Sequence, residues 1–492
     1  MKLKVQVIIE SDGGHTTVQE VACVERGAQR LAQLGLSLKE GNTLLLEIQR
    51  AMVQEQVQHY AVTHHHCADC GTLRGLKGTH AIVYRTVFGM LWVSSPRLYA
   101  CRCRKRATKS TSPLAKLITE RTTPELVYLQ NRFAAVMSFE AAETLLQEVL
   151  PLSGTVSVAG IHRTVQKVAK RLERELGPER PVFIDGCQRD WDKLPAPGPP
   201  LTVGLDGGYV HAKQQRSRHE GWFEVIVGKS VTDDGDGKCF AYVQTHDTRP
   251  KRRLFEFLKS QRVQENQTVR FLTDGGDDVR AVAELLSAES EHMLDWFHIT
   301  MRLTVMGQMA KSLPGHRADT PEQPEDEEVE DIEPTVAAEA TVGTSVHVCG
   351  RLGRVKWLLW HGNVRRALEE IEDIIRVVEA VSNGADGEPK LLRAAKEFET
   401  YIESNAGLIP NYGDRYRHGE RITTAFVESA VNQVISKRLV KKQHMRWSEE
   451  GAHNLLQVRT RVLNNDLRRL FERWYPTLGG VAVDGPLTRK AA

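Results

Sequence analysis

The chain has 492 residues, too many for a single hydrophobic core, so we expect three or four domains. Its hydrophobic fraction of 41% is ordinary for a soluble globular protein, and no run of about 18 apolar residues occurs, so neither a transmembrane helix nor a membrane partner is predicted. The formal net charge of +3 is nearly neutral, so a polyanionic partner would have to be met at local basic clusters.

Residues 1–63 are predicted to form an α/β segment. Charged and apolar residues alternate over Met1–Glu10, which is a strand pattern without the apolar block or the cleavage site of a signal peptide. Helices are expected between Ala28 and Tyr60. The sequence therefore predicts a cytoplasmic protein.

Residues 64–111 are predicted to form a zinc-ribbon-like unit. Two thiol pairs, Cys67-Ala-Asp-Cys70 and Cys101-Arg-Cys103, flank a hairpin expected at Ala81–Val87 and Met90–Val93. Two such pairs can close a tetrahedral structural Zn²⁺ site, although the second has one intervening residue where ribbons usually have two. Free buried cysteines remain the alternative, and the histidines at 64–66 are interpreted as a solvated run. Basic residues on the same knuckle are expected to face phosphates: Arg102, Arg104, Lys105 and Arg106.

Residues 112–193 are predicted to form a helical DNA-binding unit. Phe139–Leu150 and Val158–Leu172 are expected helices joined by a turn at Pro151–Gly154, and Ser157 is placed to cap the second. This is a helix-turn-helix-like arrangement, with an ordinary helical hairpin as the alternative. Polar residues of the second helix would read DNA: His162, Arg163, Gln166 and Lys167.

Residues 200–313 are predicted to form the first part of an RNase H-like catalytic core, after a proline-rich linker at Leu194–Pro200. Three strands are expected first, followed by helix and strand in alternation. In an RNase H-like sheet the first three strands form an antiparallel meander and the later ones join by helical crossovers. The expected strands are Thr202–Leu205, Phe223–Val227, Phe240–Gln244, Val269–Thr273 and His292–Leu294, and the expected helices are Leu254–Leu258 and Val279–Leu286.

The core is predicted to be interrupted by residues 314–420 and completed by residues 421–475. Thr320–Glu339 is acidic and lacks aromatic residues, so it is expected to be disordered. Val355–Ser404 has a helical pattern, and a helix around Thr423–Arg438 is expected to close the core. The sequence therefore predicts a multidomain α/β protein with an all-helical insertion in its catalytic core.

Three carboxylates are the candidate catalytic residues. Asp206 and Asp274 each end an apolar strand and precede two glycines, and Glu428 lies on the polar face of the closing helix. Three hard carboxylates suit two Mg²⁺ ions roughly 4 Å apart, as used in phosphoryl transfer. The alternative is that both Asp-Gly-Gly segments are surface turns and Glu428 an exposed helix residue.

Further candidates lie near these carboxylates. His298, in Asp295-Trp-Phe-His298, is expected to bind a phosphate or orient a catalytic group, with a structural histidine as the alternative. Cations that follow Glu428 would hold phosphates, with a solvated helix face as the alternative: Lys437, Lys441, Lys442 and Arg446. Trp447 is expected to stack on an unpaired base.

These segments resemble a known family. The two Asp-Gly-Gly segments, Asp295-Trp-Phe-His298 and Glu428-Ser-Ala-Val-Asn-Gln are similar to those of DDE transposases from ISKra-type bacterial insertion sequences. The paired-cysteine region and the stretch from Lys437 to Arg461 also resemble that family, and the resemblance extends to about Asn464.

The resemblance implies divalent metal, Mg²⁺ or Mn²⁺, at Asp206, Asp274 and Glu428, with Asp295 and His298 matching a D-x-x-H element. It implies a bacterial DNA transposase that binds double-stranded DNA, both the terminal repeats of its element and the target, and acts by cleavage and strand transfer. We expect a homodimer or higher oligomer on DNA. Two other functions stay open: an RNase H-like nuclease without strand transfer, and a catalytically inactive DNA-binding regulator.

Overall fold

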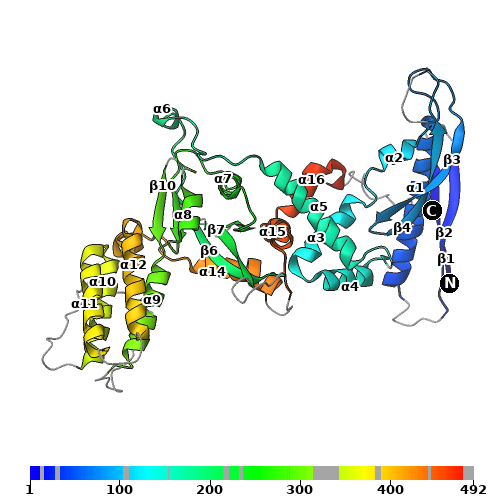
Figure 1. The fold of residues 1–492 in the computed structure, drawn as a ribbon. Coiled ribbons are helices and arrows are strands. Elements are labelled where there is room, and N and C mark those ends of the chain that lie inside the picture. Colours follow the sequence, from blue (N-terminus) through cyan, green and yellow to red (C-terminus); the bar gives the residue numbers. More distant parts are fainter. Residues whose placement is uncertain are drawn as a thin grey trace, which may run out of the picture. The chain divides into compact units, whose positions relative to one another are not determined.

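The chain is a mixed α/β protein with several separate sheets. It divides into two compact units, one formed by Met1–Arg171 with Arg461–Ala492 and the other by Leu172–Thr460 (Figure 1). None of the described helices has the length and apolar character needed to cross a membrane. The computed structural model describes residues 1–10, 16–27, 34–103, 110–152, 154–213, 221–231, 237–284, 286–287, 289–313, 343–382, 389–440 and 445–479.

The first unit begins with two small sheets and a long helix. Strands β1 (Lys2–Glu10) and β2 (Thr16–Glu25) pair antiparallel, which confirms the predicted N-terminal strand. Ser37 starts α1 (Leu38–Thr63) with a capping box, in which Ser37 and Glu40 satisfy each other's backbone amides. The predicted hairpin is also present and is longer than expected: β3 (Leu76–Thr86) pairs with β4 (Gly89–Tyr99), and β4 with the short β5 (Ser110–Thr111).

Helices complete the first unit. The two helices predicted on either side of Pro151–Gly154 are present as α4 (Phe139–Val149) and α5 (Val158–Leu176), and the Ser157 hydroxyl accepts a hydrogen bond from the Gly160 amide at 3.2 Å, as expected for a cap. Buried Phe139 and Leu146 of α4 and buried Ile161 and Val165 of α5 are the apolar faces of the pair. The remaining elements are α2 (Pro113–Leu117), α3 (Pro124–Val136), α16 (Leu467–Trp474) and η4 (Pro476–Gly479).

The second unit is built on a five-stranded sheet with the order β10-β9-β6-β7-β8. Its strands are β6 (Leu201–His211), β7 (Trp222–Val231), β8 (Cys239–Val243), β9 (Val269–Thr273) and β10 (Ser290–Leu294). The first three pair antiparallel in sequence, whereas β6, β9 and β10 pair parallel. This confirms the predicted meander followed by helical crossovers, which are α7 (Pro250–Ser260) and α8 (Asp277–Ala283).

Helices cover both faces of this sheet. On one face the buried residues Leu201, Val203 and Leu205 alternate along β6 and belong to one buried cluster with residues of α7 and α8. On the other face lie α14 (Ala425–Val431), the π-helical η3 (Asn432–Val440) and α15 (Glu449–Leu463), which contacts β8 through a hydrogen bond from Gln457 to the Ala241 carbonyl. A short helix, α6 (Gln188–Trp191), precedes the sheet.

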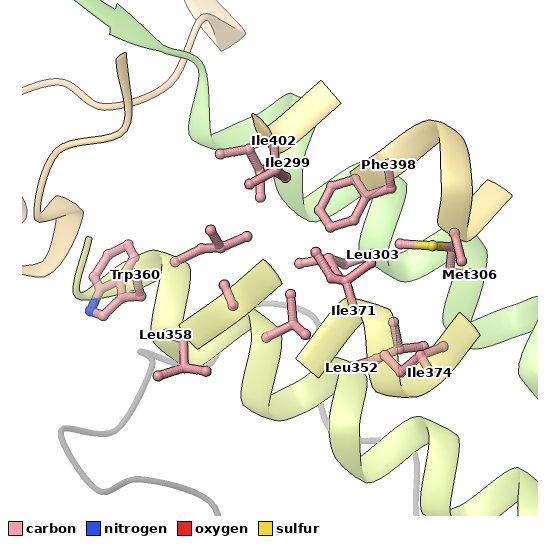
Figure 2. Close-up of a cluster of buried hydrophobic side chains, with 14 of the residues drawn as sticks. Ile299, Leu303, Met306, Leu352, Leu358, Trp360, Ile371, Ile374, Phe398 and Ile402 are labelled. Carbon is pink, nitrogen blue, oxygen red and sulfur yellow. The ribbon is translucent and has the colours of Figure 1, made fainter. Parts of the chain in front are cut away.

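A helical bundle lies between β10 and α14, and it starts earlier than the insertion predicted at residues 314–420, because buried residues of Trp296–Ala310 belong to its core. It contains α9 (Trp296–Ala310), α10 (Thr344–Trp360), α11 (Val364–Ser382), α12 (Lys390–Ser404), η2 (Ala406–Leu408) and α13 (Tyr412–Arg417). Figure 2 shows its buried core, where Ile299 and Leu303 of α9 lie beside Ile402 and Phe398 of α12. The acidic tract predicted at Thr320–Glu339 lies outside the described residues.

Two sequence-based expectations need revision. Asp206 does not end its strand, because β6 continues to His211 and stays paired with β7 over its whole length, so Asp206-Gly-Gly is not a turn. The segment predicted as residues 421–475 is divided between the units, with the chain after Thr460 grouped with the first unit.

Candidate active site

Strand register brings three aspartates together on one face of the sheet. In the parallel pair of β6 and β9, Gly204 lies opposite Leu272, so continuing the register by two residues brings Asp206 beside Asp274. In the pair of β9 and β10, Thr273 lies opposite Leu294, so the next residues are Asp274 and Asp295. Residues in register on neighbouring strands project to the same face. The sheet thus aligns Asp206, Asp274 and Asp295 side by side.

Two glycines of β6 let the helix that carries Glu428 approach the same face. Gly204 and Gly208 flank Asp206 in the alternating pattern of the strand, so all three face α14 and η3. A Cβ atom at Gly204 would overlap Val427, and one at Gly208 would lie 2.6 Å from Ile435 Cδ1. A side chain at Gly204 would push α14 away from the sheet, whereas one at Gly208 would require the end of the Ile435 side chain to move. Gly204 therefore lets Val427, and with it the neighbouring Glu428, lie close to the sheet face that carries Asp206.

The carboxyl group of Asp206 is electrostatically coupled to the other two candidates. Burial raises its pKa to about 6, and the negative charges of Asp274 and Glu428 add to the rise, while the Gly207 amide and His298 oppose it. The Gly207 amide donates to Asp206 Oδ1 at 2.8 Å. At least two of the three carboxylates lie more than 4.8 Å apart. The charges of Asp274 and Glu428 nevertheless act on Asp206.

Asp295 is the hydrogen-bond acceptor that links His298 to the start of α14. It is fully buried and accepts hydrogen bonds from the Phe297 amide at 2.9 Å, from His298 Nδ1 at 2.8 Å, and from both the amide and the hydroxyl of Thr424. The bond to Asp295 raises the pKa of His298, burial opposes the rise, and the charges of Asp274 and Asp206 add to it. Asp295 therefore orients His298 and also anchors the residue that precedes α14.

The four cysteines of the first unit form a compact thiol cluster. Cys67 Sγ lies 3.6 Å from Cys103 Sγ, Cys70 Sγ lies 3.4 Å from Cys101 Sγ, and all four lie within 4.8 Å of one another. Four thiolates around Zn²⁺ at about 2.3 Å would be about 3.8 Å apart, so the cluster fits a tetrahedral ion. The hydroxyl and amide of Thr72 lower the pKa of Cys70 to about 6, whereas the neighbouring thiols raise the pKa of Cys103 to about 12.

We expect purified protein to contain one zinc ion per chain and Cys101→Ser to lose most of it, because structural zinc needs all four ligands for its full affinity. Metal analysis by mass spectrometry measures this. Cys23→Ser is the matched control, since Cys23 is exposed on β2 outside the cluster. Unmutated protein that carries no zinc would refute the prediction.

A second compact group consists of Glu173, Asp247 and His453, whose ligand atoms also lie within 4.8 Å of one another. Its geometry would admit a metal, but the side chain of Arg253, 7% exposed, lies among them. Arg253 Nε donates to Asp247 at 2.6 Å and Nη2 to Glu173 at 3.0 Å, and His453 Nε2 lies 3.3 Å from Glu173. We interpret this group as an ion-pair network, because the guanidinium already supplies the positive charge.

The predicted DNA-contacting residues have different surroundings. Lys167 is ion-paired with Glu120 at 2.7 Å, and His162 packs its ring edge against Phe139 at 5.3 Å, while Gln166 is half-buried. The other described candidates are exposed: Arg102, Arg163, Lys437 and Arg446. The remaining basic candidates lie outside the described residues: Arg104, Lys105, Arg106, Lys441 and Lys442.

Trp447 contradicts the expected stacking on an unpaired base. Its side chain is 5% exposed, its indole nitrogen donates to the Leu439 carbonyl at 3.2 Å, and its backbone bridges to Ala212 beside β6. The ring is therefore part of the core, where it packs near the guanidinium of Arg438 at 5.4 Å.

Sequence reasoning singled out Asp295 but missed its partner Thr424, through which it positions α14. Thr424 and Asp295 are 129 residues apart, and no short motif joins them. The role of the glycines could have been recognised from the sequence. Gly204, Asp206 and Gly208 alternate on one strand face, and that spacing indicates a closely packed helix.

No protein-family model matches this sequence, and no curated protein matches it at a significant level.

Proposed function

We propose that this chain is a DDE-type DNA transposase with an RNase H-like catalytic core, which binds the ends of an insertion sequence, cuts there and joins them to target DNA. The observation that carries the proposal is that Asp206 and Asp274 lie in register on one sheet face with Glu428 in electrostatic range of Asp206, whose pKa is raised by burial and further by the charges of Asp274 and Glu428. The strand order of the sheet and the helical insertion before α14 agree with such a core and support the proposal.

The carboxylates suit hard divalent ions such as Mg²⁺ or Mn²⁺. All three donors are oxygens, and the pKa of Asp206 is raised first by burial and then by the charges of Asp274 and Glu428, which a bound cation would offset. Asp206, Asp274 and Glu428 would hold the metal, which when bound polarises a phosphate oxygen and neutralises charge on the leaving oxygen. The Gly276 amide donates to Asp274 Oδ1 at 3.1 Å and so fixes the direction of that carboxylate.

The proposed reaction has two in-line displacements at phosphorus. Water first attacks the phosphodiester at the element's end, forming a P–O bond as the bond to the 3′-oxygen breaks. The freed 3′-hydroxyl then attacks a target phosphodiester and displaces another 3′-oxygen. The same carboxylates can serve both steps, because the groups that attack and leave are alike.

His298 would assist at the phosphate. Its Nδ1 is engaged with Asp295, so Nε2 is the ring atom that remains for the substrate. The raised pKa favours the imidazolium, which would donate a hydrogen bond to a phosphate oxygen and add positive charge. The zinc-ribbon-like unit and the pair of α4 and α5 would bind the DNA ends through Arg102 and Arg163.

A cleavage and joining assay tests the proposal. With Mg²⁺, purified protein should cut a labelled duplex carrying an end of the parent element and join it to a plasmid, and Asp206→Asn should do neither. Asp192→Asn, at the exposed C-terminal end of α6, is the control expected to retain both activities. Cleavage without joining would indicate the nuclease alternative, and binding without cleavage by the unmutated protein would indicate the regulator; either result rejects the proposal.

A further inference from the structure

Arg302 lies one helical turn beyond His298 on α9. Residues four apart share a helix face, with a rise of about 6 Å between them. The charges of Asp274 and Asp206 act on His298, so His298 lies near the carboxylates. Arg302 lies one turn further along the same face of α9. Arg302 belongs neither to the basic residues at 102–106 nor to those at 437–446.

The guanidinium of Arg302 is exposed and stacked on an aromatic ring. Its Cζ lies 4.2 Å from the ring centroid of Tyr401 on α12. Within the described part of the chain, no carboxylate forms an ion pair with it. Stacking restrains the plane of a guanidinium while leaving its N–H edge available, and that edge matches two oxygens of one phosphate.

Tyr401 connects this arginine to the second catalytic aspartate. Its hydroxyl donates to the backbone carbonyl of Asp274 at 3.0 Å. One turn later, Asn405 packs so closely on Gly275 that a Cβ atom there would lie 2.5 Å from its side-chain oxygen. The α9 and α12 helices are themselves joined through the core in Figure 2, where Ile299 lies beside Ile402. The guanidinium and the Asp274 loop therefore rest on the same tyrosine.

We propose that Arg302 binds a backbone phosphate of the DNA strand next to the one that reacts, and that Tyr401 fixes its position relative to Asp274. Arg302 is then a DNA-binding residue and Tyr401 a positioning residue. The inserted helices thereby complete the site, since both residues belong to them. This inference rests on the proposed function and adds a specific ligand, the non-bridging oxygens of a DNA phosphodiester.

DNA binding with Mg²⁺ withheld tests the contact separately from catalysis. Fluorescence anisotropy of an element-end duplex over a range of salt should give Arg302→Ala a slope of log affinity against log salt smaller in magnitude by about 1, as for the loss of one phosphate contact. Arg365→Ala is the matched control, because Arg365 is an exposed arginine of the same bundle, paired with Glu369. Inorganic phosphate at the concentration of DNA phosphate should not compete, which separates a DNA site from a site for free anion.

Neutral linkages locate the contact on the DNA. We place a methylphosphonate in turn at each position around the cleavage site. At one position it should weaken DNA binding by the unmutated protein, and at that same position it should not further weaken DNA binding by Arg302→Ala. Tyr401→Phe keeps the ring but loses the bond to Asp274, so it should retain the salt slope and the linkage profile while cleaving more slowly. The inference would be overturned if Arg302→Ala kept the salt slope and the methylphosphonate profile of the unmutated protein. It would also be overturned if Tyr401→Phe lowered the salt slope by about 1, as Arg302→Ala should. Failure of the unmutated protein to bind the ends would instead reject the proposed function.

Discussion

Glu428→Gln should reduce DNA cleavage and strand transfer by at least about 100-fold while leaving binding to the element's ends nearly intact. Removing a residue that only hydrogen-bonds to a metal ligand lowers metal affinity or activity by about 10- to 100-fold. Glu428→Gln removes a charged oxygen from the metal site itself, so its effect should be at least as large. Glu428 is exposed on α14, so the amide fits without disturbing the core. Binding to the ends depends on basic surfaces elsewhere and should stay within about twofold.

Single-turnover assays with labelled element ends measure both activities, and anisotropy without metal measures binding. Glu403→Gln, an exposed glutamate near the end of α12, is the matched control and should behave as the unmutated protein. A Glu428→Gln protein that joins ends to target at the normal rate would show that Glu428 is not the third carboxylate.

Local pattern in the sequence was enough to predict much of the fold. The apolar run that precedes Asp274 predicted β9 with its bounds, and the spacing of Ser157 from the apolar face of α5 predicted that helix start. Both depend on period and capping, which act over a few residues. The position of Asp206 within β6 was wrong for the same reason, because two glycines usually end a strand and only the pairing with β7 keeps this one extended.

Long-range packing accounts for what the sequence did not reveal. Tyr401 lies 127 residues from Asp274 in the sequence, and no local pattern predicts that its hydroxyl donates to the Asp274 carbonyl. Trp447 follows a basic stretch, which suggested a nucleic-acid contact, but its indole fills the space beside η3 and its donor finds the Leu439 carbonyl. Residues that hold a site in place are therefore harder to recognise than the residues that react.

The ion-pair network around Arg253 gives the largest expected effect on stability. Glu173→Gln should lower the free energy of unfolding of the second unit by about 3 kcal/mol, because it leaves a buried guanidinium with only part of its compensating charge. Glu173 also accepts from Arg249 at 2.7 Å and lies 3.3 Å from His453, so one substitution weakens the attachment of the end of α5 to both α7 and α15. Urea unfolding followed by tryptophan fluorescence measures the change.

The effect should depend on pH with a defined sign. Burial alone would raise the pKa of Glu173, but the hydrogen bond from His453 and the charge of Arg253 outweigh it and lower the pKa to about 2. A carboxyl with a lowered pKa stabilises the folded state above its ordinary pKa of about 4.5, and this contribution is lost as the pH falls toward 2. The difference between the unmutated protein and Glu173→Gln should therefore be full at pH 7 and shrink below pH 4.5. Glu369→Gln, which breaks an exposed pair with Arg365 in the second unit, should cost less than about 1 kcal/mol at any pH. Equal losses in the two variants would contradict the prediction, because the buried network would then contribute no more than a surface ion pair.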